Sequence, residues 1–232
     1  MKLAIMQPYF FPYIGYWQLL NLVDRFVIYD DVNYIKRGWI NRNRILINGQ
    51  PNYITVPLNH ASQNKLICDM SMQASPKWRK KLIKSIGNSY GKAPFYSSVF
   101  PILDKIISYD TDNLAEFLSH QLVTLAAFLG INTKFIMTSR CYKNISLTGQ
   151  DRIIDICKHE KASIYINPRG GQTLYNTDTF NHEDIDLQFI TMRPFPYKQR
   201  VAGFSPCLSI IDPLMEIGAA ELMHHINEFD LS

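Results

Sequence analysis

Hydrophobic residues near the start of the chain follow two patterns, short continuous runs and helical spacing. Residues 2–6 form a short apolar run typical of a buried strand, and residues 26–29 form a second. Residues 16–23 between them place apolar side chains at helical spacing, after a loop in which Pro8 and Pro12 prevent the strand from continuing. A strand, a loop, a helix and a strand in this order predict a βαβ unit, and such crossovers imply a parallel sheet.

The rest of the chain continues to alternate between strands and helices. A hairpin is predicted at 44–56, with Asn48-Gly49 at its turn. Further helices are expected at 76–90, 100–108, 113–129, 151–161, 208–218 and 220–227, and further strands at 133–137, 163–166 and 187–191. We therefore expect one α/β domain over residues 1–232, with a mainly parallel sheet, flanking helices and a helical insertion or subdomain at about 76–130.

Composition narrows the functional classes. The net charge of +4 is mildly basic and is not gathered into the dense Lys/Arg stripes of a dedicated nucleic-acid-binding protein, although it suits a nucleotide or a nucleotide sugar. The four cysteines are scattered without metal-ligand spacing, so no metal site is predicted and a reducing compartment is expected. We find no signal peptide and no apolar run of membrane-spanning length, and we expect a cytoplasmic protein.

The loop after the first strand is the first candidate binding segment. Ligands of open parallel sheets bind beyond the carboxyl ends of the strands, and the start of the next helix offers free N–H groups to an anion. The candidate substrate-binding residues are Gln7, Tyr9, Tyr13 and Tyr16. Tyr13-Ile14-Gly15-Tyr16 stands where adenylyl-transferring folds carry His-x-Gly-His, so the layout resembles the start of a nucleotidyltransferase, although tyrosine lacks the charge and pKa of histidine. The alternative interpretation is a turn that packs one edge of the core.

Residues 30–44 form the densest polar stretch in the chain. Asp30 and Asp31 end the second strand, and either carboxylate could act as a general base or as a ligand of Mg²⁺. Arginine and lysine suit phosphate groups, and tryptophan offers a stacking face for a base or a sugar ring. The candidate binding residues here are Lys36, Arg37, Trp39, Asn41 and Arg42. The alternative is a surface loop with local ion pairs, which contribute little to stability.

Two later segments supply weaker candidates. Arg169, Gly170 and Gly171 follow a predicted strand and could form an anion-binding turn, or a turn without a ligand. Tyr197 and Gln199 follow two prolines in a loop, where a phenol and an amide could hold sugar hydroxyls. Ser209 and Asp212 precede an apolar helix, and their spacing favours a capping box over a catalytic serine.

Together these segments resemble one family. The start of the chain resembles the WbqC-like proteins through the segment MQPYFFPYIGYWQLLNLVDRFVIYDDVNYIKRGWINRNRI. Later segments also resemble this family, namely WRKKLIKSIGNSYGKAPFY, residues 165–175, Tyr197-x-Gln199 and residues 204–212. The resemblance spans essentially the whole chain, and it adds Tyr175 to the candidate binding residues. Because such proteins are often encoded in gene clusters for surface polysaccharides such as O-antigen, part of lipopolysaccharide, the resemblance implies a role in modifying an amino sugar, for example by acyl or glycyl transfer.

Three functional hypotheses remain open from the sequence. The first is a transferase that modifies a nucleotide-linked amino sugar, with Asp30 or Asp31 as the base that deprotonates the attacking amine or hydroxyl. The second is an adenylate-forming or nucleotidyl-transfer enzyme, in which Mg²⁺ would accompany the nucleotide. The third is a non-catalytic scaffold that uses the aromatic loop to bind a partner. The oligomeric state does not follow from the sequence.

Overall fold

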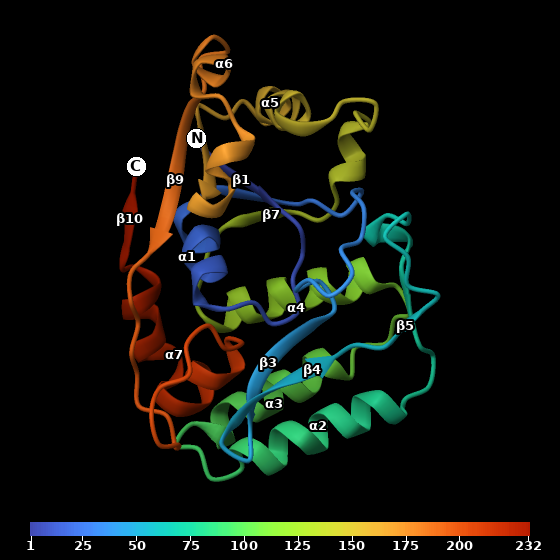
Figure 1. Cartoon of the computed structure of the whole chain (residues 1–232), viewed down its shortest axis with the longest axis vertical. Coiled ribbons are helices and arrows are strands. Elements are labelled where there is room, and N and C mark those ends of the chain that lie inside the picture. The colour runs from blue at the N-terminus through green and yellow to red at the C-terminus, as the bar shows by residue number, and fades with distance from the viewer.

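A sheet of six strands forms the centre of the computed structural model, which describes all 232 residues (Figure 1). The spatial order is β10-β9-β8-β1-β2-β7, and every neighbouring pair is parallel except β9 and β10. The strands span Lys2–Met6 (β1), Arg25–Ile28 (β2), Lys134–Ile136 (β7), Ile164–Pro168 (β8), Asp186–Met192 (β9) and Phe229–Leu231 (β10). This mainly parallel sheet, with helices on both sides, confirms the predicted α/β class.

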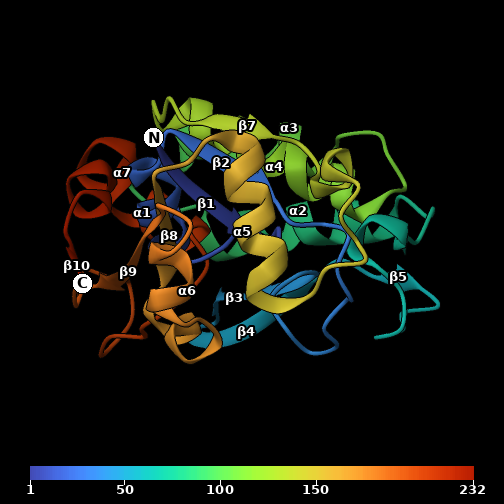
Figure 2. The same ribbon diagram turned by 90° about the horizontal axis from the view of Figure 1, so that it is seen from above.

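Helices cover both faces of the sheet (Figure 2). On one face, buried side chains of α1 (Ile14–Leu22), α4 (Leu114–Phe128) and α7 (Ile211–Ile226) join a core cluster of 46 residues. On the other face, α5 (Gly149–Glu160) and α6 (Thr177–Asn181) contribute to a smaller cluster of 13 residues. Alternate residues of β2 pack in different clusters, because successive side chains of a strand point to opposite faces of the sheet. Phe26 and Ile28 belong to the larger cluster and Val27 to the smaller one.

The connection between β2 and β7 holds most of the remaining structure. It contains the hairpin of β3 (Arg42–Ile47) and β4 (Gln50–Thr55), the short pair β5 (Leu58–Asn59) and β6 (Ser71–Met72), the 3₁₀ helix η1 (Ile67–Asp69), and the helices α2 (Lys77–Tyr90) and α3 (Tyr96–Ile107), followed by α4. The helices of residues 76–130 share the 46-residue cluster with β2, because Leu82, Leu103 and Phe117 belong to it together with Phe26.

The strand order reverses beside β1. The chain moves from β1 outward to β2 and β7, and then returns to the other side of β1 to form β8 and β9. β1 pairs with β2 at four positions, whereas it pairs with β8 only at Lys2–Ile164 and Leu3–Tyr165. The carboxyl ends of β1 and β8 are therefore not joined by ladder hydrogen bonds, and a reversal of this kind is where open α/β sheets leave room for a ligand.

Most predicted elements are confirmed, and the differences have local causes. Helix α3 begins at Tyr96, earlier than predicted, because Pro101 lies inside the helix and not in its first turn. The two predicted C-terminal helices form one element that is interrupted at Gly218, whose φ of +79° is not helical. A Cβ atom at this position would lie 2.5 Å from the Phe95 ring, so the kink requires glycine. None of the helices combines the length and apolar character needed to cross a bilayer.

Candidate functional site

The loop after β1 is fixed by buried hydrogen bonds to two distant side chains. Gln121 of α4 accepts from the Phe11 backbone N–H at 2.9 Å and donates to the Tyr9 carbonyl at 3.0 Å. Asn43 of β3 donates to the carbonyls of Phe10 and Phe11 at 3.0 and 2.7 Å. Phe10 and Phe11 are completely buried, whereas Tyr9 and Tyr13 are only partly buried. The loop therefore combines both interpretations of its sequence, because its phenylalanines belong to the core and its tyrosines face a surface hollow.

An aromatic groove runs over this loop toward the end of β9. Two adjoining cavities of about 360 and 260 Å³ share Tyr13, Met192 and Cys207. Tyr9 and Trp39 line one end of the groove, and the other end is lined by Phe195, Tyr197 and Phe204. Helix α1 begins at this groove, because Ile14 lines it and the N-cap residue Tyr13 makes no side-chain capping bond. The structure thus brings together four predicted site residues, Tyr9, Tyr13, Trp39 and Tyr197.

Two other predicted residues of the first loop do not line the aromatic groove. Tyr16 is buried, and its hydroxyl donates to the Gln7 carbonyl at 3.0 Å. Burial raises the pKa of Tyr16 well above its ordinary value of 10.0, so this phenol stays protonated. Of the two tyrosines in the His-x-Gly-His positions, Tyr13 faces the groove and Tyr16 supports the backbone of the loop.

The predicted basic residues divide into free and engaged side chains. Lys36 and Arg37 are exposed beside Trp39, which is itself 41% exposed, and neither forms an ion pair. Arg42 donates to the carbonyls of Gly38 and Arg37, and its guanidinium lies 4.3 Å from the centre of the Tyr53 ring. Asn41 is buried and donates to the Val56 carbonyl at 2.8 Å. Arg42 and Asn41 therefore hold the loop that presents Lys36, Arg37 and Trp39.

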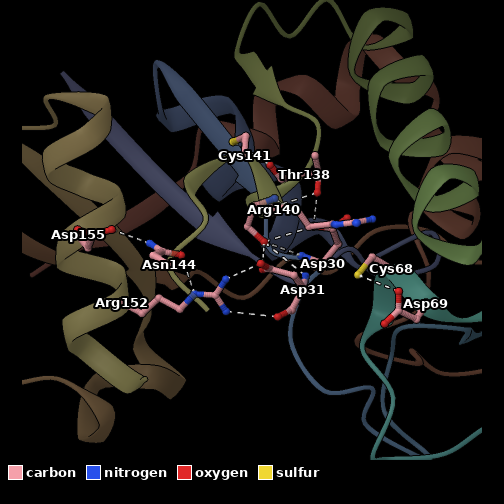
Figure 3. A network of polar contacts seen from close by, with 11 residues as sticks. Asp30, Asp31, Cys68, Asp69, Thr138, Arg140, Cys141, Asn144, Arg152 and Asp155 are labelled. Atoms are coloured by element: carbon pink, nitrogen blue, oxygen red, sulfur yellow. Dashed lines mark hydrogen bonds and ion pairs between the residues drawn. The ribbon is translucent and has the colours of Figure 1, made fainter. Parts of the chain in front are cut away.

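The two aspartates that follow β2 have different main partners, although both contact the Ser139 hydroxyl. Asp31 accepts from Nη2 of Arg152 on α5 at 2.6 Å and also from the Ser139 hydroxyl (Figure 3). Asp30 is directed toward α4, and its Oδ1 accepts from the Thr138 hydroxyl at 2.8 Å and from the Ser139 backbone N–H at 3.0 Å. Burial raises the pKa of Asp30. The sequence left open which aspartate is available to a ligand, and the contacts select Asp30, because Asp31 is bound to Arg152 and Asp30 lines a cleft.

Asp30 lines a polar cleft that is separate from the aromatic groove. The cleft has a volume of about 520 Å³, and Cys68, Glu116, His120, Thr138 and Arg140 also line it. Glu116 accepts from the Tyr109 and Thr111 hydroxyls, both at 2.8 Å, and these hydrogen bonds, with that from Thr111 the stronger influence, lower its pKa. Burial lowers the pKa of His120, which favours the neutral imidazole. No residue lines both the cleft and the groove.

The sequence analysis overlooked most residues of the polar cleft. Thr138 and Arg140 follow β7 at the same edge of the sheet as Asp30, with Arg140 in the 3₁₀ helix η2 (Ser139–Tyr142). The strand-end rule that selected Asp30 would have selected them as well, because β7 was predicted correctly. Glu116 and His120 lie on α4 and carry no comparable signal. No group of three or more His, Cys, Asp or Glu side chains is arranged to hold a metal ion.

The predicted glycine turn after β8 is part of the 3₁₀ helix η3 (Arg169–Leu174). Arg169 is exposed and Gly170 has open space around it, whereas a Cβ atom at Gly171 would lie 2.4 Å from Oδ1 of Asn167. Asn167 donates to the Tyr165 hydroxyl at 2.7 Å, and that hydroxyl lies 3.4 Å from the hydroxyl of Tyr175. Arg169 and Tyr175 therefore lie at the carboxyl edge of the sheet but line neither the groove nor the cleft.

Tyr197 and Gln199 belong to a buried polar network around Asp212. The hydroxyls of Tyr197 and Tyr90 donate to the two carboxylate oxygens of Asp212, both at 2.9 Å, and Gln199 donates to the Tyr197 hydroxyl at 3.0 Å. Burial raises the pKa of Asp212 to about 6. The predicted capping box is half present: the Ser209 hydroxyl oxygen accepts from the Ile211 N–H at 3.3 Å, but the Asp212 carboxylate accepts from the two tyrosines and not from the Ser209 N–H, which donates to the Arg44 carbonyl. Ser209 donates to the Phe11 carbonyl at 2.9 Å and thereby joins the first turn of α7 to the β1 loop.

Comparisons with known proteins place this geometry in a family. The chain is 28% identical over 225 residues to an uncharacterized protein of Mycobacterium tuberculosis, Rv1507c, and the match covers 94% of each chain. No solved structure matches the chain significantly. The model of the WbqC-like protein family matches residues 7–224, and the chain therefore belongs to this family.

Proposed function

We propose that the protein is a transferase that modifies a nucleotide-linked amino sugar and binds the nucleotide part in the aromatic groove. The observation that carries this proposal is the position of the groove, which lies over the β1 loop at the carboxyl edge of the sheet and opens at the start of α1. Sheets whose strand order reverses beside the first strand commonly bind nucleotides at this edge. The family resemblance to proteins of surface-polysaccharide gene clusters supports a sugar as the other half of the ligand.

The lining of the groove suits each part of such a ligand. A base or a sugar ring can stack on Trp39, Tyr9 or Tyr13, whose rings are at least partly accessible. Phosphates carry negative charge, and the unpaired side chains of Lys36 and Arg37 lie in the same loop as Trp39. The free N–H groups at the start of α1 favour an anion at the same place.

Titration calorimetry with UDP-, dTDP- and GDP-linked sugars tests the proposal. We expect at least one of them to bind at millimolar concentration or below, and we expect Trp39→Ala to weaken that binding about tenfold, since base–aromatic stacking contributes on the order of 1–3 kcal/mol. Ile145→Ala is the matched control, because Ile145 is an exposed apolar side chain outside both cavities. Failure of every nucleotide sugar to bind would refute the proposal.

Asp30 is the carboxylate that we assign to proton transfer in this reaction. An amine must lose a proton before it attacks an acyl donor, and a general base must reach it directly or through one water. Asp31 is bound to Arg152, whereas Asp30 lines an open cleft, so Asp30 can serve an amine that reaches from the groove into that cleft. We expect Asp30→Asn to abolish transfer while nucleotide binding in the groove remains.

Nucleotidyl transfer is a second candidate, and the position of Tyr13 favours it. Tyr13 is the N-cap residue of α1 and lines the groove, at the position where the resemblance to adenylyl-transferring folds expects the first histidine. The two functions differ in their nucleotide. ATP that binds only in the presence of Mg²⁺, together with no affinity for nucleotide sugars, would favour nucleotidyl transfer over the first proposal.

A further inference from the structure

The polar cleft contains a buried negative charge without a cationic partner. Asp30 and Asp31 are 4% and 5% exposed, and removal of a carboxylate from water is unfavourable unless a cation or several hydrogen bonds compensate for it. Asp31 has Arg152 at 2.6 Å, but no Lys, Arg or His lies within 4.0 Å of the carboxylate of Asp30. The two adjacent aspartates thus share the same burial and differ in charge compensation.

The hydrogen bonds of Asp30 leave one of its oxygens free. Oδ1 accepts from the Thr138 hydroxyl and from the Ser139 N–H, and it lies 3.3 Å from the Ser139 hydroxyl, which is closer to Asp31. Oδ2 accepts no hydrogen bond from any residue, although it is not sealed from solvent. The protein thereby fixes the orientation of the carboxylate through Oδ1 and leaves Oδ2 for a donor in the cleft.

The rest of the cleft selects the kind of donor. No three acidic, imidazole or thiol groups converge there to enclose a metal ion by themselves. Glu116 is exposed and each of its oxygens accepts one hydroxyl donor, whereas Asp30 is the buried carboxylate with an oxygen that accepts none. The guanidinium of Arg140, in turn, forms no ion pair, and Figure 3 shows its side chain extending past Asp30 on the side of Cys68. The cleft therefore contains one buried carboxylate oxygen without a hydrogen-bond donor, on Asp30, and one guanidinium without an ion pair, on Arg140.

We propose that the polar cleft binds a small ligand with a primary ammonium group and an anionic group, the ammonium at Oδ2 of Asp30 and the anion at Arg140. An amino-sugar phosphate and a free amino acid both have this chemistry. The inference rests on the proposed transferase only in treating the cleft as a substrate site, and it does not require a nucleotide in the aromatic groove. It gives Asp30 a binding role in addition to the proton transfer assigned above.

Calorimetry on the full-length protein without nucleotide tests this inference with four probes. Glucosamine 6-phosphate and L-serine carry both charges, glucosamine lacks the anion, and glucose 6-phosphate lacks the amine. We expect one of the first two probes to bind more tightly than glucosamine, and glucose 6-phosphate not to bind. Which of the two binds identifies the source of the amine. The inference is overturned if neither of them binds at millimolar concentration, or if glucose 6-phosphate binds as tightly as its amine counterpart.

Variants separate the two ends of the ligand. Asp30→Asn should weaken binding of the preferred probe about tenfold or more, because a hydrogen bond to a charged group contributes roughly 1.5–3 kcal/mol. Arg140→Ala, on the exposed rim, should weaken that probe to a similar degree and leave glucosamine binding unchanged. Asp69→Asn is the matched control, since Asp69 is an exposed acid next to the cleft residue Cys68 and lies outside the cleft lining.

The variant Trp39→Ala distinguishes failure of this inference from failure of the proposed function. Trp39 lines the groove and not the cleft, so its loss should leave the amine titration unchanged. If Trp39→Ala abolished amine binding, the cleft would not be a separate site and the inference would be wrong. If nucleotide sugars failed to bind while the amine probe bound in a manner that depends on Asp30, the inference would survive without the proposed function.

Discussion

At the residue scale, the pair Asp31 and Arg152 compensates a buried charge within the protein. Nη2 of Arg152 lies 2.6 Å from the carboxylate, Nη1 donates to the Asp31 carbonyl at 3.3 Å, and Nε donates to Asn144 at 3.0 Å. Both side chains are almost fully buried. A pair of this kind adds little net stability compared with apolar residues, but removal of one partner leaves a charge in the interior.

We therefore predict that Arg152→Ala lowers the free energy of unfolding by about 3–5 kcal/mol. The exposed pair of Arg193 and Asp230 provides the comparison, because more than half of each side chain is exposed to solvent. Arg193→Ala should leave the free energy of unfolding nearly unchanged, because water and salt screen an exposed pair. Urea denaturation of both variants measures the difference, and equal losses would mean that burial does not determine the strength of these pairs.

The raised pKa of Asp212 predicts that the stability of the protein depends on pH. Burial raises its pKa from 3.8 to about 6, so the folded protein keeps the proton between these values and the unfolded chain releases it. The free energy of unfolding should then fall as the pH rises through this window, with a slope of at most about 1.4 kcal/mol per pH unit from this group. The variant Asp212→Asn has no carboxyl group at this position and therefore does not show this pH dependence.

Denaturation of the wild type and of Asp212→Asn between pH 4 and pH 8 isolates the contribution of Asp212. The wild type should lose stability relative to the variant as the pH rises to about 6, and the difference should then stay constant. A constant difference over the whole range would show that Asp212 titrates normally. Asp30, whose pKa is also raised by burial, is present in both proteins and does not enter the comparison.

At the scale of elements, the 3₁₀ helix η3 depends on one of its two glycines. A side chain at Gly171 would collide with Asn167, which itself donates to Tyr165, whereas Gly170 faces open space. We predict that Gly171→Ala lowers the free energy of unfolding by about 1–3 kcal/mol, because an added methyl group must displace packed neighbours. Gly170→Ala is the matched control and should be nearly neutral. Thermal unfolding of the two variants distinguishes them.

The hydrophobic pattern predicted the long elements because each of them buries a regular stripe or a continuous run of apolar side chains. Lys2–Met6 and the hairpin around Asn48-Gly49 follow directly from it. Strands β5, β6 and β10 have two or three residues each and are too short to show a period. The role of Asp212 was predicted wrongly because its partners, Tyr90 and Tyr197, come from other elements and local spacing points to a cap.

At the scale of the whole molecule, the sequence identified several residues of the candidate sites but not which of them lie together in space. Tyr9, Tyr13 and Trp39 share the aromatic groove with Cys207 and Met192, which lie far along the chain. Asp30 and Asp31, predicted to act beside them, point instead to α4 and α5. The strand order decides this arrangement, and a single sequence shows that β1 and β2 are neighbours without showing where β8 and β9 insert.

Cys141 and Cys207 have exposed thiols, and comparison of their reactivities in the same protein tests whether a ligand binds in the groove. Cys207 lines it, whereas Cys141 is exposed in η2 and lines neither cavity. We predict that a bound nucleotide sugar slows the reaction of Cys207 with a disulfide reagent several-fold and leaves Cys141 unaffected, because the ligand covers Cys207 in the groove whereas Cys141 lines neither cavity. Peptide mass spectrometry after timed labelling measures both sites together. Equal protection of the two thiols would point to a general stabilisation and not to binding in the groove.

The short pairing of β1 with β8 has a further consequence for cooperativity. Ladder hydrogen bonds join the two halves of the sheet at only two residue pairs, so fluctuations that separate β8 and β9 from β1 and β2 break few backbone bonds. The coupling between the two halves then depends mainly on side-chain packing, in which Leu3 and Val27 share a buried cluster with Tyr165 and Leu187. A molecule held at the same time by the β1 loop and by the end of β9 would bridge that seam, and its binding energy would appear as slower amide exchange along β8.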